Sequence, residues 1–315
     1  MNKRYFSLLV LALITFNALL AQTQTSATSG NWNEGSTWEG GEVPTVRSNV
    51  VIAAGHNVLL DAPVTKTRGS TVTIDANASL TLSAALTIAN SSSATELVVN
   101  GSLLIGSGNY LISGGGNANA SVGPTGMIDL LSTISGTSVY NWDFQAGSTL
   151  QLSAAGNQSL DVDFNGTAID NLILSGTGVK ALTESITVSE VLTVSGTASL
   201  SVGTYILTYG AASTLRYLTT DVRTVGVEWP AIFNGSGGVI IGNTAGSIAL
   251  NGAKTLGASL TLNSGSTFIT NNQGISLGGN WTNNGATFTP GTGAVTFTGR
   301  DRKSTRLNSS HGIIS

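Results

Sequence analysis

Residues 79–105 read SLTLSAALTIANSSSATELVVNGSLLI, and apolar side chains occupy alternate positions in four short runs. The runs are Leu80–Leu82, Leu86–Ile88, Leu97–Val99 and Leu103–Ile105. Alternation with a period of two predicts β-strands that bury one face. We therefore expect this segment to fold as a succession of short strands.

The same alternating runs recur along the rest of the chain. They are Val58–Leu60, Val72–Ile74, Leu111–Ile112, Leu150–Leu152, Leu172–Leu174, Ile186–Val188, Leu192–Val194 and Leu260–Leu262. Glycine, asparagine and serine separate the runs, and these residues readily adopt the positive φ angles that tight turns require. Because no sustained period of 3.6 residues is present after the N-terminus, the sequence predicts an all-β fold.

Two segments of the chain resemble each other. Residues 192–210 align with residues 260–278, an offset of roughly 68 residues, or about three coils of ~22 residues. Stacked parallel β-coils repeat on this scale, and their inward Leu, Ile and Val side chains form continuous apolar columns. We therefore predict a parallel, right-handed β-helix (β-solenoid) of roughly eleven coils.

The composition limits the chemistry that the protein can perform. The chain has 315 residues, of which 41% are hydrophobic, 9% are charged and none is cysteine. A hydrophobic content this high allows a buried core and argues against disorder. The lack of cysteine excludes disulfides, thiolate zinc sites and cysteine nucleophiles. Because the histidines are His56 and His311 alone, we expect a protein without catalytic activity of its own.

The N-terminus has the pattern of an export signal. Lys3 and Arg4 precede an apolar run over residues 5–20, which gives way at Ala21 to a polar stretch. The run is shorter than the ~20 residues that a membrane-spanning helix needs, and Ala21 is the expected cleavage point. We expect the mature chain to have no membrane span and to be secreted or held at the outer cell surface.

The last fifteen residues differ in composition from the rest. Asp301–His311 match, residue for residue, the translation of a common short-read sequencing adapter. We therefore expect residues 301–315 to be an artefact, with the natural chain continuing beyond Arg300. Between residues 22 and 300, eight basic residues stand against fifteen acidic ones, a balance of −7 that argues against nucleic-acid binding. His56 then remains as the one authentic histidine, and its place in a turn favours a structural role.

The pattern of runs and turns divides the chain into six parts. They are a signal peptide at 1–21, an N-terminal cap with the first strands at 22–61, a β-helical repeat block at 62–210, an inter-repeat loop region at 211–238, a second repeat block at 239–300 and the artefact at 301–315. The open ends of a β-helix need covering, and the large rings of Trp32 and Trp38 suit the N-terminal end. The alternative role of these two tryptophans is stacking on a sugar.

The loop region holds a local cluster of charged and aromatic residues. Arg216 and Arg223 flank Asp221 and lie close in sequence to Glu228 and Trp229. Such a cluster is a candidate ligand-binding site, and a solvated loop between two repeat blocks is the alternative. The candidate ligand-binding residues are thus Trp32, Trp38, Arg216, Arg223 and Trp229.

An acidic segment provides the candidate metal ligands. Asp161–Gly166 reads DVDFNG, which matches the start of a calcium-binding EF-hand loop. The twelfth position of that loop should be a bidentate carboxylate, but Leu172 stands there. A strand with alternating outward acids is therefore the favoured interpretation, and Asp161, Asp163 and Asp170 remain the candidate Ca²⁺ ligands.

The N-terminal part resembles a known family. Residues 31–61 are similar to the opening of glycine-rich repeat domains in large secreted proteins of Bacteroidota, which are related to the eight-glycine domain of animal ectoproteins. Residues 171–176, 228–230 and 279–297 resemble repeats of the same exported proteins. The resemblance implies a β-helical architecture outside the cell, and secretion by the type IX machinery through a C-terminal sorting domain.

These observations favour a secreted or surface-attached, adhesin-like repeat protein that presents its loops to a glycan or a neighbouring cell. Two alternatives remain at this stage. A glycan-binding module would need Trp32, Trp38 or Trp229 exposed. A β-helix polysaccharide lyase or hydrolase would need paired carboxylates with basic residues nearby, and no Lys or Arg occurs between Arg68 and Lys180.

Overall fold

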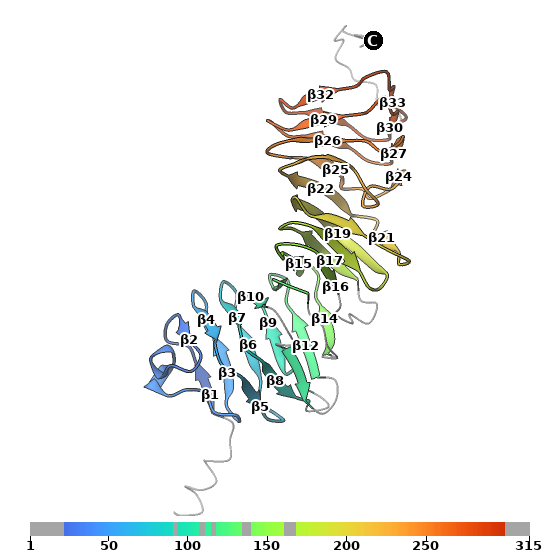
Figure 1. Ribbon diagram of the computed structural model, residues 1–315. Helices are drawn as coiled ribbons and strands as arrows, with labels where there is room; N and C mark the ends of the chain where they lie inside the picture. Colours follow the sequence, from blue (N-terminus) through green and yellow to red (C-terminus); the bar gives the residue numbers. More distant parts are fainter. Residues whose placement is uncertain are drawn as a thin grey trace, which may run out of the picture. The chain divides into compact units, whose positions relative to one another are not determined.

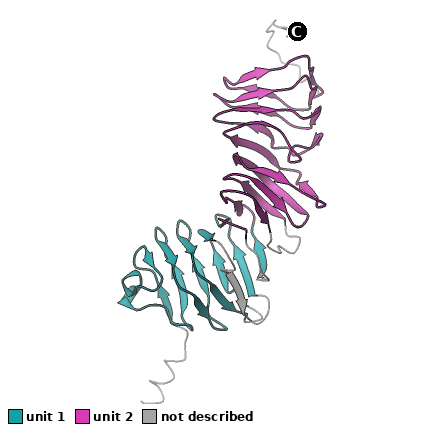
Figure 2. Cartoon of the chain, in the orientation of Figure 1, with its two compact units in different colours: residues 1–128, 135–145 teal, residues 129–134, 146–315 magenta. Residues whose placement is uncertain are grey.

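The computed structural model describes residues 22–90, 94–106, 111–114, 118–133, 140–160 and 168–299. Regular structure in these ranges is β-strand, apart from two single-turn 3₁₀ helices, η1 (Gly35–Thr37) and η2 (Glu39–Gly41). The chain forms two compact units, residues 1–128 with 135–145 and residues 129–134 with 146–315 (Figure 2). The predicted signal peptide and the predicted artefact lie outside the described residues.

Unit 1 is a stack of coils with three parallel sheets (Figure 1). The first sheet contains β1 (Thr23–Thr25), β3 (Asn49–Ile52), β6 (Val72–Ile74), β9 (Leu97–Val99), β12 (Ala118–Val122) and β14 (Tyr140–Phe144). The second contains β2 (Gly30–Asn31), β4 (Asn57–Leu60), β7 (Ser79–Leu82) and β10 (Ser102–Ile105), and the third contains β5 (Val64–Lys66), β8 (Leu86–Ala89) and β11 (Leu111–Gly114). Strand β13 (Met127–Leu130) follows at the division between the units.

Unit 2 has one sheet that continues through all of its coils. This sheet contains β15 (Thr149–Leu152), β17 (Ile169–Leu174), β19 (Ile186–Gly196), β22 (Thr214–Thr219), β25 (Gly238–Ile241), β28 (Leu260–Leu262) and β31 (Trp281–Asn283), and β21 (Leu207–Tyr209) pairs with the first part of β19. The shorter ladders are β16 (Gln158–Leu160), β18 (Val179–Leu182) and β20 (Ser199–Ser201); then β23 (Val222–Thr224), β26 (Ser247–Ala249), β29 (Thr267–Ile269) and β32 (Thr287–Thr289); and β24 (Ile232–Phe233), β27 (Lys254–Leu256), β30 (Ile275–Leu277) and β33 (Val295–Phe297).

The register of unit 2 confirms the repeat that the sequence predicts. Leu192 pairs with Leu215, Leu215 with Val239, and Val239 with Leu260, so the offset between Leu192 and Leu260 is three coils. All four side chains are fully buried. Full burial of each such side chain is worth about 1.5–3 kcal/mol, so the column holds successive coils together. The described residues form about 11 coils, and the predicted β-solenoid is confirmed.

The aromatic cap at the start of unit 1 is buried. Trp32 is 0% and Trp38 2% exposed, and their rings meet edge to face at 5.1 Å. The indole N–H of Trp38 donates to the carbonyl of Trp32 at 2.7 Å. A sugar cannot stack on rings that are covered by protein, so the sugar-stacking alternative for these residues is wrong and packing is their role.

The region 211–238 is not a loop. It contains β22, β23 and β24, and β22 lies in register between β19 and β25 in the continuous sheet. The compact units also divide the chain inside the predicted block 62–210 instead of at this region. None of the helices among the described residues has the length and apolar character to span a membrane.

Candidate functional site

Two ladders of unit 2 stop at the same coil. On one face the ladder that ends with β20 does not continue into β23, and on another face β21 does not pair with β24. Among the strand ladders of the described residues, the continuous sheet alone crosses this place, through the pairing of β19 with β22. We call this double interruption the seam. It lies in the region where the sequence places the cluster of charged and aromatic residues.

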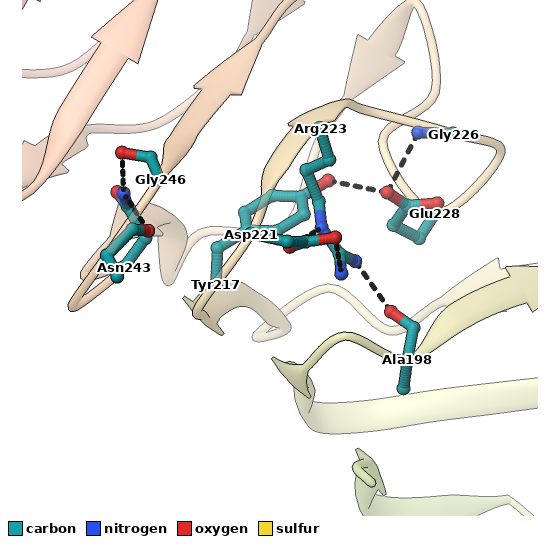
Figure 3. A network of polar contacts seen from close by, with 9 residues as sticks. Ala198, Tyr217, Asp221, Arg223, Gly226, Glu228, Asn243 and Gly246 are labelled. Carbon is teal, nitrogen blue, oxygen red and sulfur yellow. Dashed lines mark hydrogen bonds and ion pairs between the residues drawn. The ribbon is translucent and has the colours of Figure 1, made fainter. Parts of the chain in front are cut away.

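Arg223 bridges the seam on the first face (Figure 3). Its guanidinium donates to both carboxylate oxygens of Asp221, at 2.8 and 2.9 Å, and to the carbonyl of Ala198 at 2.6 Å. Ala198 directly precedes β20, so the last bond joins the two coils whose strands do not pair. Arg223 also stands in register with the buried Ile248 of the next coil, which places an arginine at an apolar column position.

Glu228 organises the interior behind the seam. It is 4% exposed, and its carboxylate accepts from the hydroxyl of Tyr217 at 3.0 Å and from the backbone N–H of Gly226 at 2.8 Å (Figure 3). The hydroxyl of Tyr209 donates to the backbone carbonyl of Glu228 at 2.5 Å. Burial, and secondly the charge of Glu228, raise the pKa of both tyrosines well above 10. Both phenols therefore stay protonated near neutral pH and act as hydrogen-bond donors.

Three lysines are buried in the coils, which the sequence analysis does not predict. Lys66 and Lys180 are 0% exposed and Lys254 is 5% exposed. Each ammonium donates to backbone carbonyls about one coil earlier: Thr45 for Lys66 (2.6 Å), Ala154 and Gly156 for Lys180 (2.7 and 3.1 Å) and Trp229 for Lys254 (2.6 Å). Burial lowers the pKa of all three, to about 8 for Lys66. These cations tie loops together and are not available to an acidic ligand.

The structure disperses the rest of the predicted cluster. Arg216 lies half-buried on β22 and donates to the hydroxyl of Thr193 at 2.9 and 3.2 Å. Trp229 is 1% exposed and stacks on Phe268, with ring centroids 6.1 Å apart. The prediction of a shared ligand site is therefore wrong for Trp229, because its faces are covered by packing.

The predicted calcium ligands are only partly described. Asp161 and Asp163 lie outside the described residues, so their role stays a prediction. Asp170 accepts a hydrogen bond from the backbone N–H of Gly147 at 2.6 Å, which joins it to the preceding coil. Across the described ranges, no group of three acidic or histidine side chains is close enough to hold a metal ion.

The turn histidine has a structural contact. Nδ1 of His56 lies 2.9 Å from the hydroxyl of Ser26, and the same hydroxyl accepts from the backbone N–H of Ala53 at 2.8 Å. Ser26 is 2% exposed, so a substrate has no access to its hydroxyl. The pair fastens the first strand to the turn after β3.

The fold gives the class of this protein, and comparison with known proteins gives a family for one segment of it. The fold defines a parallel β-solenoid protein. Within unit 1, residues 37–120 match the family model of the G8 domain, and this segment runs from the aromatic cap to β12. No curated protein and no solved structure matches the chain. The match supports the predicted resemblance of the N-terminal part to the eight-glycine domain.

Replacing Arg223 by methionine is expected to lower the free energy of unfolding by about 1–3 kcal/mol, because Asp221 and the Ala198 carbonyl lose their charged donor. Arg216→Met is the matched control. Its guanidinium contacts a single hydroxyl on a half-exposed face, so we expect a loss below about 1 kcal/mol. Urea unfolding of both variants measures the difference. Equal losses would show that the seam does not depend on the Arg223 bridge.

Proposed function

We propose that this protein is an exported, non-catalytic repeat protein that serves as an adhesin-like scaffold at the cell exterior. The β-solenoid fold and the G8-like segment are compatible with a structural or extracellular role. The observation that carries the proposal is the use of the candidate cluster in packing. Arg223 donates to the carbonyl of Ala198 in the preceding coil, and the backbone carbonyl of Glu228 accepts from Tyr209 of that coil, which favours a scaffold over a reactive site.

Fractionation of the source organism tests the export. An antibody against unit 2 should detect the protein in the medium or on the outer surface, and mass spectrometry of the mature chain should find Gln22 at its N-terminus, within a few residues. Accumulation of the chain in the cytoplasm with residues 1–21 still attached would contradict the proposal.

A depolymerisation assay tests the lack of catalysis. The purified protein should release no reducing ends and no unsaturated sugars from a panel of neutral and acidic polysaccharides. Activity that the purified protein shows and a mock purification lacks would contradict the proposal, and its loss in the Glu228→Gln variant would assign it to that carboxylate. Retention of intact cells by beads that carry the protein, compared with beads that carry bovine albumin, measures adhesion directly.

A further inference from the structure

The second interruption at the seam separates two strands whose side chains still meet. Strand β21 pairs with β19, and β24 pairs with β27, but no ladder of the described residues joins β21 to β24. The rings of Tyr209 on β21 and Phe233 on β24 nevertheless meet at 4.9 Å in an edge-to-face contact. The interior stacking thus continues from one coil to the next, while the two backbones do not pair.

One edge of β21 is unpaired. The pleat of a strand turns the N–H and C=O groups of successive residues to opposite sides. Gly210 directs its N–H to the carbonyl of Val188 in the coil of β19, at 2.8 Å. The backbone groups of Leu207 and Tyr209 therefore face the other way, toward β24.

Strand β24 presents the complementary edge. Phe233 uses its carbonyl to accept from the N–H of Gly257 in the following coil, at 3.0 Å. Its neighbours Ile232 and Asn234 therefore direct their backbone groups toward β21. Each of the two strands thus offers donors and acceptors to the space between them, and a strand edge of this kind is a template for a further strand.

The space between these edges is a groove of about 310 Å³. Its walls are residues 207–211, Pro230 and residues 232–235, and none of these side chains is charged at neutral pH. The bond from the N–H of Ser236 to the carbonyl of Ala211, 2.8 Å long, joins the two walls beyond the ends of the strands. Two aliphatic side chains at the rim of the groove are open to solvent, Ile232 of the wall at 61% and the neighbouring Ile206 at 66%.

We propose that this groove docks an extended, uncharged segment of a partner protein, which adds as a β-strand to the free edges of β21 and β24. In strand addition, main-chain hydrogen bonds recognise the extended backbone of the bound peptide, and pockets or rims select every second side chain of that peptide. An uncharged lining favours an uncharged occupant, since a charged one would lose water without gaining a counter-charge. Ile206 and Ile232 favour aliphatic side chains in the occupant. The inference goes beyond the proposed function and does not depend on export.

A capped peptide, acetyl-TVTVT-amide, is the probe, and the full chain is the receptor. Hydrogen–deuterium exchange should show protection confined to residues 205–211 and 230–236 when the peptide is added. Ile232→Lys places a charge at the rim and should weaken binding about tenfold or more, which corresponds to ~1.4 kcal/mol. Val222→Lys is the matched control, because Val222 is 78% exposed and lies on β23, outside the groove lining.

The same peptide with alternate amide nitrogens methylated keeps its side chains but loses half of its donors, and it should not protect the groove. Equal binding of the methylated peptide would overturn strand addition. The proposal is also overturned if millimolar peptide protects neither segment, if Ile232→Lys binds as the unchanged protein does, or if cellohexaose protects these segments and the peptide does not. The last result would assign the groove to a neutral glycan.

Discussion

Replacing Gly238 by alanine is expected to lower the free energy of unfolding by about 3 kcal/mol or more. Gly238 begins β25 with φ of 74°, a left-handed conformation that costs other residues about 1–2 kcal/mol. A Cβ at this position would lie 2.1 Å from the carbonyl oxygen of Ser259 in the next coil. The same oxygen accepts the ladder bond from Val239 at 3.0 Å, so the backbones must separate and the ladder weakens.

Gly265→Ala is the matched control for this substitution. Gly265 has φ of 78°, close to that of Gly238, but a Cβ there would meet nothing within 4 Å. We expect the backbone cost alone, about 1–2 kcal/mol. Guanidinium unfolding of the two variants isolates the close approach of neighbouring coils. If the two losses agreed, the short distance between β25 and the coil that follows would have no energetic importance.

The fold is predictable from the sequence because each coil repeats a local pattern. Alternation places Leu192 and Leu260 on the inward side of their strands whatever the distant contacts are, and stacking then aligns them with the coils between. The prediction of a loop at 211–238 is wrong for a physical reason. Its strand β23 has an arginine at the inward position, so the apolar period is lost although the strand is present.

The alternating pattern of the sequence contains a signal for the burial of two lysines. Lys180 precedes Leu182 by two residues and Lys254 precedes Leu256 by two, so each lysine shares the inward side of its strand with a buried leucine. A lysine is ordinarily placed outside, since burial of a charge is costly. The carbonyls that receive these ammonium groups lie 24–26 residues earlier, and no local pattern indicates them.

The groove at the seam is beyond sequence reasoning for a related reason. The groove exists because β21 and β24, which are about one coil apart in the sequence, do not form ladder hydrogen bonds with each other. Trp229 and Pro230 lie at this place in the sequence. The tryptophan suggests a binding platform there, but its ring packs on Phe268. The residues that line the groove are ordinary ones, such as Leu207 and Ile232, and their exposure follows only from the fold.

Raising the pH from 8 to 10 is expected to increase the free energy of unfolding, by about 2 kcal/mol from Lys66. Burial lowers the pKa of Lys66 in the folded protein to about 8, from 10.5 in the unfolded chain. Below pH 8 the ammonium is charged in both states, and its burial opposes folding. Between pH 8 and 10.5 the unfolded chain binds more protons than the folded one, so stability rises with pH. Lys180 and Lys254, whose pKa values are also lowered, act in the same direction.

Lys66→Met isolates this contribution, because methionine fills similar space and cannot titrate. The difference in unfolding free energy between the unchanged protein and this variant should grow in favour of the unchanged protein from pH 8 to 10, as measured by urea unfolding at each pH. Above pH 10 both proteins should lose stability, since Tyr209 and Tyr217 ionise in the unfolded chain but resist ionisation when buried beside Glu228. A difference that stays constant from pH 8 to 10 would mean that Lys66 keeps its ordinary pKa, and that its bond to the Thr45 carbonyl fully offsets the loss of water around the ammonium.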